Sequence, residues 1–162
     1  RYRYVFACLM LLSVVSQTSF ADQNERLAEL DAYWAGAART VREGDFEGYS
    51  ATYHQDAILV SGAKKESYPI SKALAGWKQG FVDTKTKKMK ANVEFRFTQR
   101  LGDDTTAHET GMFHYWTVDA DGKTTDAYVH FEGLLIKKKT GWKLMMEYQK
   151  SPATLSQWNA AK

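Results

Sequence analysis

The stretch TAHETGMFHYWTVDADGKTTDAYVHFEGLLIKK, Thr106–Lys138, contains two long strand patterns joined by a turn. The first pattern covers Thr106–Val118 and the second covers Thr124–Lys138. Between them lies Asp119-Ala120-Asp121-Gly122, whose Asp-Gly pair is a strong signal for a β-hairpin. The stretch therefore predicts a long antiparallel hairpin.

Further strands are predicted on both sides of this hairpin. The segment Val93–Thr98 alternates apolar and polar residues, which is typical of a half-buried strand. Thr140-Gly141 predicts a second turn, followed by a last strand over Trp142–Gln149. Earlier in the chain, the short apolar run Ala57–Val60 fits a buried strand.

The first half of the chain has a helical period instead. Apolar residues of Asp22–Glu43 recur every three or four positions, which predicts an amphipathic helix. Asp45 is a helix-capping residue before a second, short helix over Phe46–Tyr53, and a third helix is predicted over Lys72–Val82. Helices followed by an antiparallel meander predict an α+β fold, with three N-terminal helices on one face of a curved antiparallel or mixed sheet.

The N-terminus has the pattern of a secretory signal peptide. Arg1 and Arg3 precede the apolar run Val5–Val15, and Ser19-Phe20-Ala21 is a small-x-small cleavage site. The apolar run is shorter than the ~20 residues that a transmembrane helix needs. We therefore predict a signal peptide over 1–21, a single exported domain over 22–162, no membrane anchor after processing, and a periplasmic or secreted location.

Composition excludes several classes of function. Cys8 is the only cysteine and lies in the predicted leader, so the processed domain has neither disulfides nor thiol chemistry. The chain has 22 basic and 19 acidic residues, and Arg1 and Arg3 are lost with the leader, so the charge is too balanced for a nucleic-acid partner. No glycine-rich phosphate loop is present, and we expect no metal ion or other cofactor.

The order of short motifs resembles a known family. Glu43-Gly44-Asp45 precedes the short helix, Tyr53-x-x-Asp56-Ala57 leads into a strand, and Thr140-Gly141-Trp142-Lys143 precedes the last strand. This order resembles the nuclear transport factor 2-like superfamily in its SnoaL-like branch. The resemblance implies a cone-shaped sheet wrapped around the helices, with a pocket inside the cone. It also implies a homodimer formed through the outer face of the sheet.

Strand pairing predicts which side chains face the pocket. A two-residue turn at Asp121-Gly122 places His114 opposite Val129, and a similar turn at Thr140-Gly141 places Gly133 opposite Tyr148. The predicted inner face then consists of Met112, His114, Trp116, Phe131, Gly133, Leu135, Met146 and Tyr148. The predicted outer face consists of Phe113, Tyr115, Tyr128, His130, Glu132, Leu134, Met145 and Glu147. We interpret His130, Glu132 and Glu147 as a hydrogen-bonding cluster at an interface and not as metal ligands.

The resemblance also implies where a ketosteroid isomerase would keep its catalytic groups. The general base of such enzymes corresponds to Ser61, and the tyrosine that stabilises the enolate corresponds to Ala37. The acidic hydrogen-bond donor falls near Phe131 or Gly133. Because none of these residues can perform the required role, we do not expect ketosteroid-type isomerisation.

Three functional hypotheses remain open. The leading one is an aromatic pocket that binds a small apolar or aromatic molecule without catalysis. The predicted ligand-binding residues are Trp34, Tyr53, His114, Trp116, Phe131 and Tyr148. The second hypothesis is an isomerase, dehydratase or cyclase, with His114 as general base, Tyr148 and Tyr53 as donors, and Asp31 orienting the imidazole. The third is a dimeric interaction domain that uses the outer face of the sheet.

Overall fold

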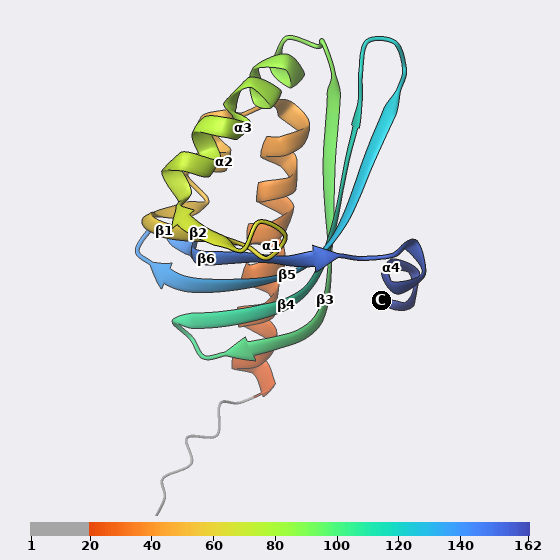
Figure 1. Cartoon of the computed structure of the whole chain (residues 1–162). Coiled ribbons are helices and arrows are strands. Elements are labelled where there is room, and N and C mark those ends of the chain that lie inside the picture. The colour runs from red at the N-terminus through yellow and green to blue at the C-terminus, as the bar shows by residue number, and fades with distance from the viewer. Residues whose placement is uncertain (1–19) are drawn as a thin grey trace, which may run out of the picture.

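The computed structural model describes residues 20–162 and contains four helices and six strands (Figure 1). The helices are α1 (Phe20–Glu43), α2 (Phe46–Ser50), α3 (Ile70–Lys85) and α4 (Leu155–Ala160). The strands are β1 (Tyr53–Ser61), β2 (Glu66–Pro69), β3 (Lys90–Gly102), β4 (Thr106–Val118), β5 (Thr124–Lys138) and β6 (Gly141–Pro152). Residues 1–19 of the predicted signal peptide lie outside the described residues, so that peptide stays a prediction.

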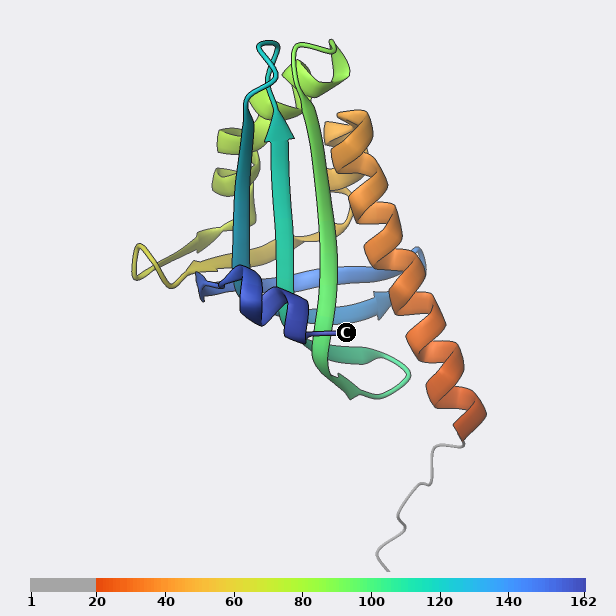
Figure 2. The same ribbon diagram turned by 90° about the vertical axis from the view of Figure 1, so that its right-hand side faces the viewer.

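The strands form one curved sheet in the order β2-β1-β6-β5-β4-β3. Neighbouring strands are antiparallel except β1 and β6, which run parallel. Helices α1 and α3 lie on the concave side of this sheet, and the short helix α4 lies on the opposite side (Figures 1 and 2). The predicted α+β fold, with a curved mixed sheet around the N-terminal helices, is confirmed.

Helix α1 follows the sheet because one stripe of its surface is apolar. Leu30, Trp34, Ala37 and Val41 recur at helical spacing and are buried. The helix ends at Glu43, and the next residue, Gly44, has a φ of 68°, which is in the left-handed region. A side chain at Gly44 could not be accommodated, since its Cβ would lie 2.4 Å from the backbone nitrogen of Lys85. This glycine therefore both ends α1 and allows α3 to pack closely.

The two hairpin strands begin and end where the sequence predicts, whereas the smaller elements differ. Helix α2 is shorter than predicted because Tyr53 already belongs to β1. Strand β2 was not predicted and pairs with β1. Helix α4 was not predicted, although Thr154 and Gln157 form a complete capping box at its start.

The register of the central hairpin is one residue away from the prediction. The loop is longer than two residues because the Asp119 carboxylate accepts hydrogen bonds from the backbone N–H groups of Asp121 and Lys123, both at 2.9 Å. His114 consequently lies opposite Tyr128 and not Val129. A shift of one residue exchanges the two faces of a strand. The placement of Met112, His114 and Trp116 on the inner face is therefore wrong.

Strand β6 also departs from the predicted alternation because its pairing with β5 is irregular at two points. Between these irregularities, Gly133 lies opposite Glu147, where the sequence predicted Tyr148. Glu147 is buried and lines the pocket, so the predicted faces of β6 are exchanged in this segment. The inner placement of Met146 and Tyr148 is wrong, whereas the three predicted inner residues of β5 (Phe131, Gly133 and Leu135) are all buried.

An aromatic cluster connects α1 to the inner face of the sheet. The ring of Trp34 lies 4.7 Å from that of Phe95 and 5.6 Å from that of Phe131, measured between centroids. Gly133 lies beneath the same indole, and a Cβ there would be 3.5 Å from two carbons of its ring. The tighter contact of an added Cβ would be with Leu144, whose Cδ2 would lie 3.1 Å away.

Candidate functional site

A cavity of about 480 Å³ lies between the helices and the inner face of the sheet. This volume falls within the range of ~300–1,000 Å³ that is typical of small-molecule sites. Aromatic residues dominate its walls, and the larger ones are Tyr33, Trp34, Tyr49, Tyr53, Trp77, Phe81, Phe95, Phe113 and Tyr115. The other lining residues are mostly small or aliphatic and include Gly76 and Gly80 of α3.

One carboxyl group interrupts this apolar lining. Glu147 is the only acidic residue among those that line the cavity, and within residues 20–162 no Lys, Arg or His contributes to its walls. Gln149, two positions further along β6, lines the same cavity. The pocket therefore combines extensive aromatic surface with a single ionisable acid.

Hydrogen bonds hold this carboxyl group in place. The hydroxyl of Tyr53 donates to Oε1 of Glu147 at 3.4 Å, and the amide Nε2 of Gln149 donates to Oε2 at 3.0 Å. The hydroxyls of Tyr49 and Tyr53 are 3.1 Å apart. A chain of polar groups thus runs from α2 through β1 to β6 along one side of the pocket.

Burial controls the protonation of these groups. Removal from water raises the pKa of the Glu147 carboxyl, and the hydrogen bonds from Gln149 and Tyr53 only partly oppose this effect. Burial, together with the nearby Glu147, also raises the pKa of Tyr49 and of Tyr53 well above that of a free tyrosine. The tyrosines are therefore neutral hydrogen-bonding groups, and Glu147 is the one carboxyl group among the described lining residues, with a pKa that burial raises.

Two of the predicted ligand-binding residues line the cavity. Trp34 projects from α1 and Tyr53 from the start of β1, and both are largely buried. Phe131 lies in the aromatic cluster below the cavity, fully buried, and does not line it. Trp34 and Tyr53 thus lie where they could contact a ligand, and their role in binding remains a prediction.

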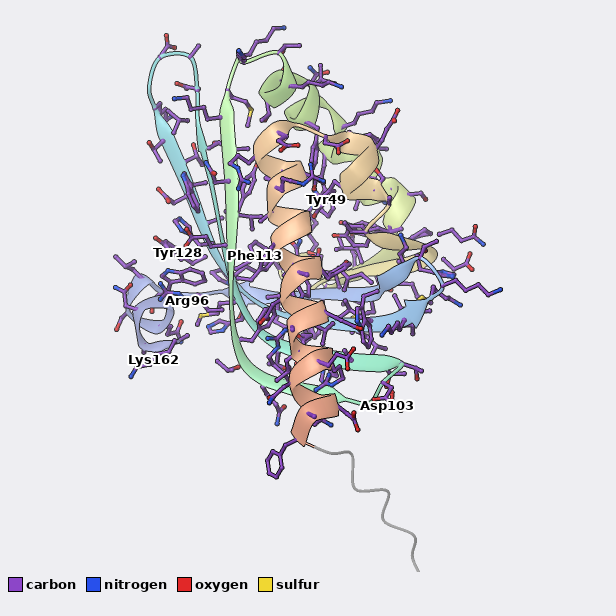
Figure 3. The ribbon with its side chains drawn as sticks, turned by 180° about the vertical axis from the view of Figure 1, so that it is seen from behind. Tyr49, Arg96, Asp103, Phe113, Tyr128 and Lys162 are labelled. Atoms are coloured by element: carbon purple, nitrogen blue, oxygen red, sulfur yellow. The ribbon has the colours of Figure 1, made fainter. Side chains whose placement is uncertain are left out.

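His114 and Trp116 lie on the outer face of the sheet, away from the pocket. The imidazole of His114 stacks between the rings of Tyr128 and Trp116, with centroids 4.1 Å and 4.5 Å away. Its Nε2 lies 2.6 Å from a carboxylate oxygen of Asp126, and Trp158 of α4 contacts it edge-on. Figure 3 shows Tyr128 beside α4, on the side of the strands away from Tyr49. A general base for the pocket is therefore not available from His114.

The other two catalytic candidates are also outside the pocket. Tyr148 lies opposite Glu132 and does not line the cavity. Asp31 is bound to Arg100, with 2.6 Å between its Oδ1 and a guanidinium nitrogen. The same guanidinium pairs with the fully buried Glu109 at 2.7 Å. Asp31 thus connects α1 to β3 and does not orient a catalytic imidazole.

The predicted cluster of His130, Glu132 and Glu147 does not form. His130 lies 3.1 Å from Oε1 of Gln157 in α4. Glu132 pairs with His108 at 3.2 Å and with Lys150 at 2.8 Å. Glu147 is on the opposite face, which sequence alternation missed because it cannot locate the irregularities of β6. No group of three or more potential metal ligands comes together in the part of the chain that the structure describes.

None of the helices within residues 20–162 combines the length and the apolar character needed to cross a bilayer.

Comparison with known proteins identifies the fold family. The profile of the SnoaL-like domain matches residues 27–154. No curated protein matches the chain in sequence. The resemblance to the nuclear transport factor 2-like superfamily, in its SnoaL-like branch, is confirmed by this match and by the solved structures.

Three solved structures illustrate the similarity. A conserved protein from Planctomyces limnophilus is 12% identical, with 80% of this chain and 99% of that chain covered and a TM-score of 0.66. An NTF-2-like protein of unknown function from Shewanella oneidensis is 17% identical, with 75% and 96% covered and a TM-score of 0.58. A ketosteroid isomerase-like protein from Erwinia carotovora atroseptica is 19% identical, with 77% and 95% covered and a TM-score of 0.55. At these identities the similarity establishes the fold alone.

Proposed function

Because the chain belongs to the SnoaL-like domain family, we propose that its pocket binds a small, mostly apolar molecule. The observation that carries this proposal is the cavity of about 480 Å³ with aromatic walls and one polar side. Sites with this combination bury the hydrocarbon part of a ligand and orient it through a few polar contacts. The Glu147 carboxyl and the hydroxyls of Tyr49 and Tyr53 are the groups that orient the ligand.

Titration with a defined probe tests this proposal. We expect 2-naphthalenemethanol, a flat apolar alcohol, to bind the purified protein saturably in isothermal titration calorimetry. Gly80→Leu should weaken this binding at least about tenfold, because the new side chain would extend into the open space above α3. Gly36→Leu is the matched control, since Gly36 is also helical with open space above it but does not line the cavity. Equal affinity in all three proteins, or no binding by the wild type, would contradict the proposal.

Acid–base catalysis is a second candidate function. The observation that favours it is a buried carboxyl with a raised pKa, hydrogen-bonded to a tyrosine hydroxyl inside the pocket. Glu147 would accept or donate the proton and Tyr53 would stabilise a developing oxyanion. The test is mass spectrometry of whatever small molecule copurifies with the protein, before and after prolonged incubation. Conversion by the wild type but not by Glu147→Gln supports catalysis, and an unchanged molecule argues for binding alone.

A homodimer is a separate proposal and concerns the outer face of the sheet. Ile58, Met146 and Leu134 lie side by side across β1, β6 and β5, and Ile58 and Leu134 are 46% and 42% exposed. A second copy is the partner we propose, because a patch that pairs with itself forms a closed two-fold interface. Leu134→Lys should convert a dimer into a monomer in light scattering, while Leu101→Lys, at another exposed leucine, should not. A wild-type protein that is monomeric at micromolar concentration would overturn this proposal.

Export is proposed from the leader pattern of residues 1–21. If the leader is cleaved after Ala21, a chain expressed with its leader in a bacterium that exports proteins should be recovered from the periplasm or medium, starting at Asp22. N-terminal sequencing measures this directly. An uncleaved chain in the cytoplasmic fraction would contradict the proposal.

A further inference from the structure

We propose that the ligand of the pocket is an apolar amine, bound as a cation with its nitrogen against Glu147 and its hydrocarbon part between the aromatic walls. This inference rests on the proposed binding function and names the chemical class of the ligand. It follows from three features of the described residues, which are the charge of the pocket lining, the environment of Glu147 and the nature of the walls.

The described side chains that line the cavity provide acidic but not basic groups. Among residues 20–162, the cavity is lined by one carboxyl group and by no basic side chain. A carboxylate or phosphate ligand would bring a second negative charge next to Glu147, without a cation to offset it. Anionic ligands are therefore disfavoured, and a ligand with a positive group would complement the site.

Glu147 differs from the other buried carboxyl group of the described chain, which is Glu109. Glu109 is paired with the guanidinium of Arg100 at 2.7 Å. Glu147 receives hydrogen bonds from Tyr53 and Gln149 only, and both of these donors are neutral. A buried carboxylate without a cationic partner is unfavourable. An ammonium group in the cavity would supply the partner that the protein provides for Glu109 but not for Glu147.

The carboxyl group retains the capacity to accept such a ligand. An ionised carboxylate has about four lone-pair sites, and each oxygen of Glu147 is occupied by one hydrogen bond. The N–H groups of an ammonium ion can therefore bind the remaining sites without displacing Tyr53 or Gln149. A charge-assisted hydrogen bond of this kind is stronger than a bond between neutral groups.

The walls of the cavity also favour a cation. Tyr53 and Tyr49 pack edge to face near the carboxyl group, with ring centroids 5.6 Å apart, and Trp77 lies 6.2 Å from Tyr49. Aromatic faces attract organic cations and pack equally well against hydrocarbon. The same rings would therefore surround both the ammonium group and the apolar part of the ligand.

Three probes with one ring system and different charges test this inference. The amine is 2-naphthalenemethanamine, the neutral analogue is 2-naphthalenemethanol, and the anion is 2-naphthoate. In calorimetric titrations at neutral pH we expect the amine to bind at least about tenfold more tightly than the alcohol, and 2-naphthoate not to saturate. An alcohol that binds as tightly as the amine, or a naphthoate that binds as tightly as the alcohol, would overturn the inference.

The variant Glu147→Gln locates the source of the preference. It should lose the preference for the amine over the alcohol, whatever its affinity for the alcohol itself, and near-ultraviolet circular dichroism should confirm an unchanged fold. Glu132→Gln is the matched control, since Glu132 is a carboxyl group of β5 that lies outside the cavity lining and pairs with Lys150. A preference for the amine that persists in Glu147→Gln would contradict the assignment. If the wild type binds none of the three probes, the proposed function itself fails, whereas binding of the alcohol without selectivity rejects only the inference about amines.

Discussion

The hydroxyl of Tyr53 lies 3.4 Å from the Oε1 atom of Glu147. This hydrogen bond joins the first strand, β1, to the last strand, β6, inside the pocket. These strands, β1 and β6, are the only parallel pair among the described residues. The contact joins residues separated by 94 positions in sequence. It places the one acidic group that lines the cavity, among residues 20–162, beside a neutral donor.

Glu147 should make stability depend on pH in a definite direction. Burial raises the pKa of its carboxyl above the usual 4.5, so the folded state holds this proton more tightly than the unfolded state. The contribution of this carboxyl group to the free energy of unfolding is therefore most favourable below pH 4.5. It decreases as pH rises from there to the raised pKa of the folded state. Glu147→Gln should lose this dependence. Urea unfolding between pH 4 and pH 8 is the measurement, and the stability of the variant relative to the wild type should increase with pH. A constant difference would show that Glu147 titrates normally.

Tyr53→Phe should destabilise the protein modestly without disrupting the core. The change removes a hydroxyl that donates to Glu147 and lies beside Tyr49, while the ring remains. Loss of one buried hydrogen bond costs about 0.5–1.5 kcal/mol, or up to ~3 kcal/mol if a partner is left unsatisfied. Urea denaturation with an unchanged m-value measures the effect. Tyr148→Phe, outside the cavity, is the control and should change the stability by less than about 0.5 kcal/mol.

Glycine positions in the pocket region should respond in opposite directions to alanine. Gly76 is helical and has no atom within 4 Å of an added Cβ, so Gly76→Ala should stabilise α3 by up to about 1 kcal/mol. At Gly133 an added Cβ would lie 3.1 Å from Leu144 Cδ2 and 3.5 Å from the Trp34 ring, so Gly133→Ala should cost about 1–3 kcal/mol. Thermal unfolding of the two variants gives the sign of the change in stability for each. Equal and small effects would mean that the Leu144 side chain moves aside easily.

His114→Ala should loosen α4 and leave the pocket unaffected. The imidazole packs between Trp116 and Tyr128 and contacts Trp158, whose backbone oxygen accepts a hydrogen bond from Arg96 at 2.6 Å. We expect a loss of about 1–3 kcal/mol of stability and faster amide exchange in α4. The affinity for 2-naphthalenemethanol should change less than about twofold. A large loss of affinity at unchanged stability would mean that His114 takes part in ligand binding.

The hairpin illustrates what alternation in a sequence can and cannot determine. Thr106–Val118 and Thr124–Lys138 were predicted with the observed bounds, because long strands with strong turn signals have distinct ends. Their register was wrong by one residue, because side-chain bonds of Asp119 lengthen the loop. That single shift moved His114 and Trp116 from the expected pocket to the outer face.

The candidate site was only partly predictable for the same reason. Trp34 was located correctly because a helix stripe tolerates small errors in boundaries. Glu147 was assigned to the wrong face, since the irregular pairing of β6 depends on tertiary contacts that one sequence does not record. Helix α4, in contrast, could have been predicted from the Thr154-x-x-Gln157 capping pattern.

A crystal structure of the protein with 2-naphthalenemethanol would show directly where an apolar probe binds. We expect one ordered probe in the cavity, with its ring system near Trp77 and Phe113 and its oxygen within hydrogen-bonding distance of Glu147. A probe ordered instead against Trp116 on the outer face, with an empty cavity, would contradict ligand binding in this pocket.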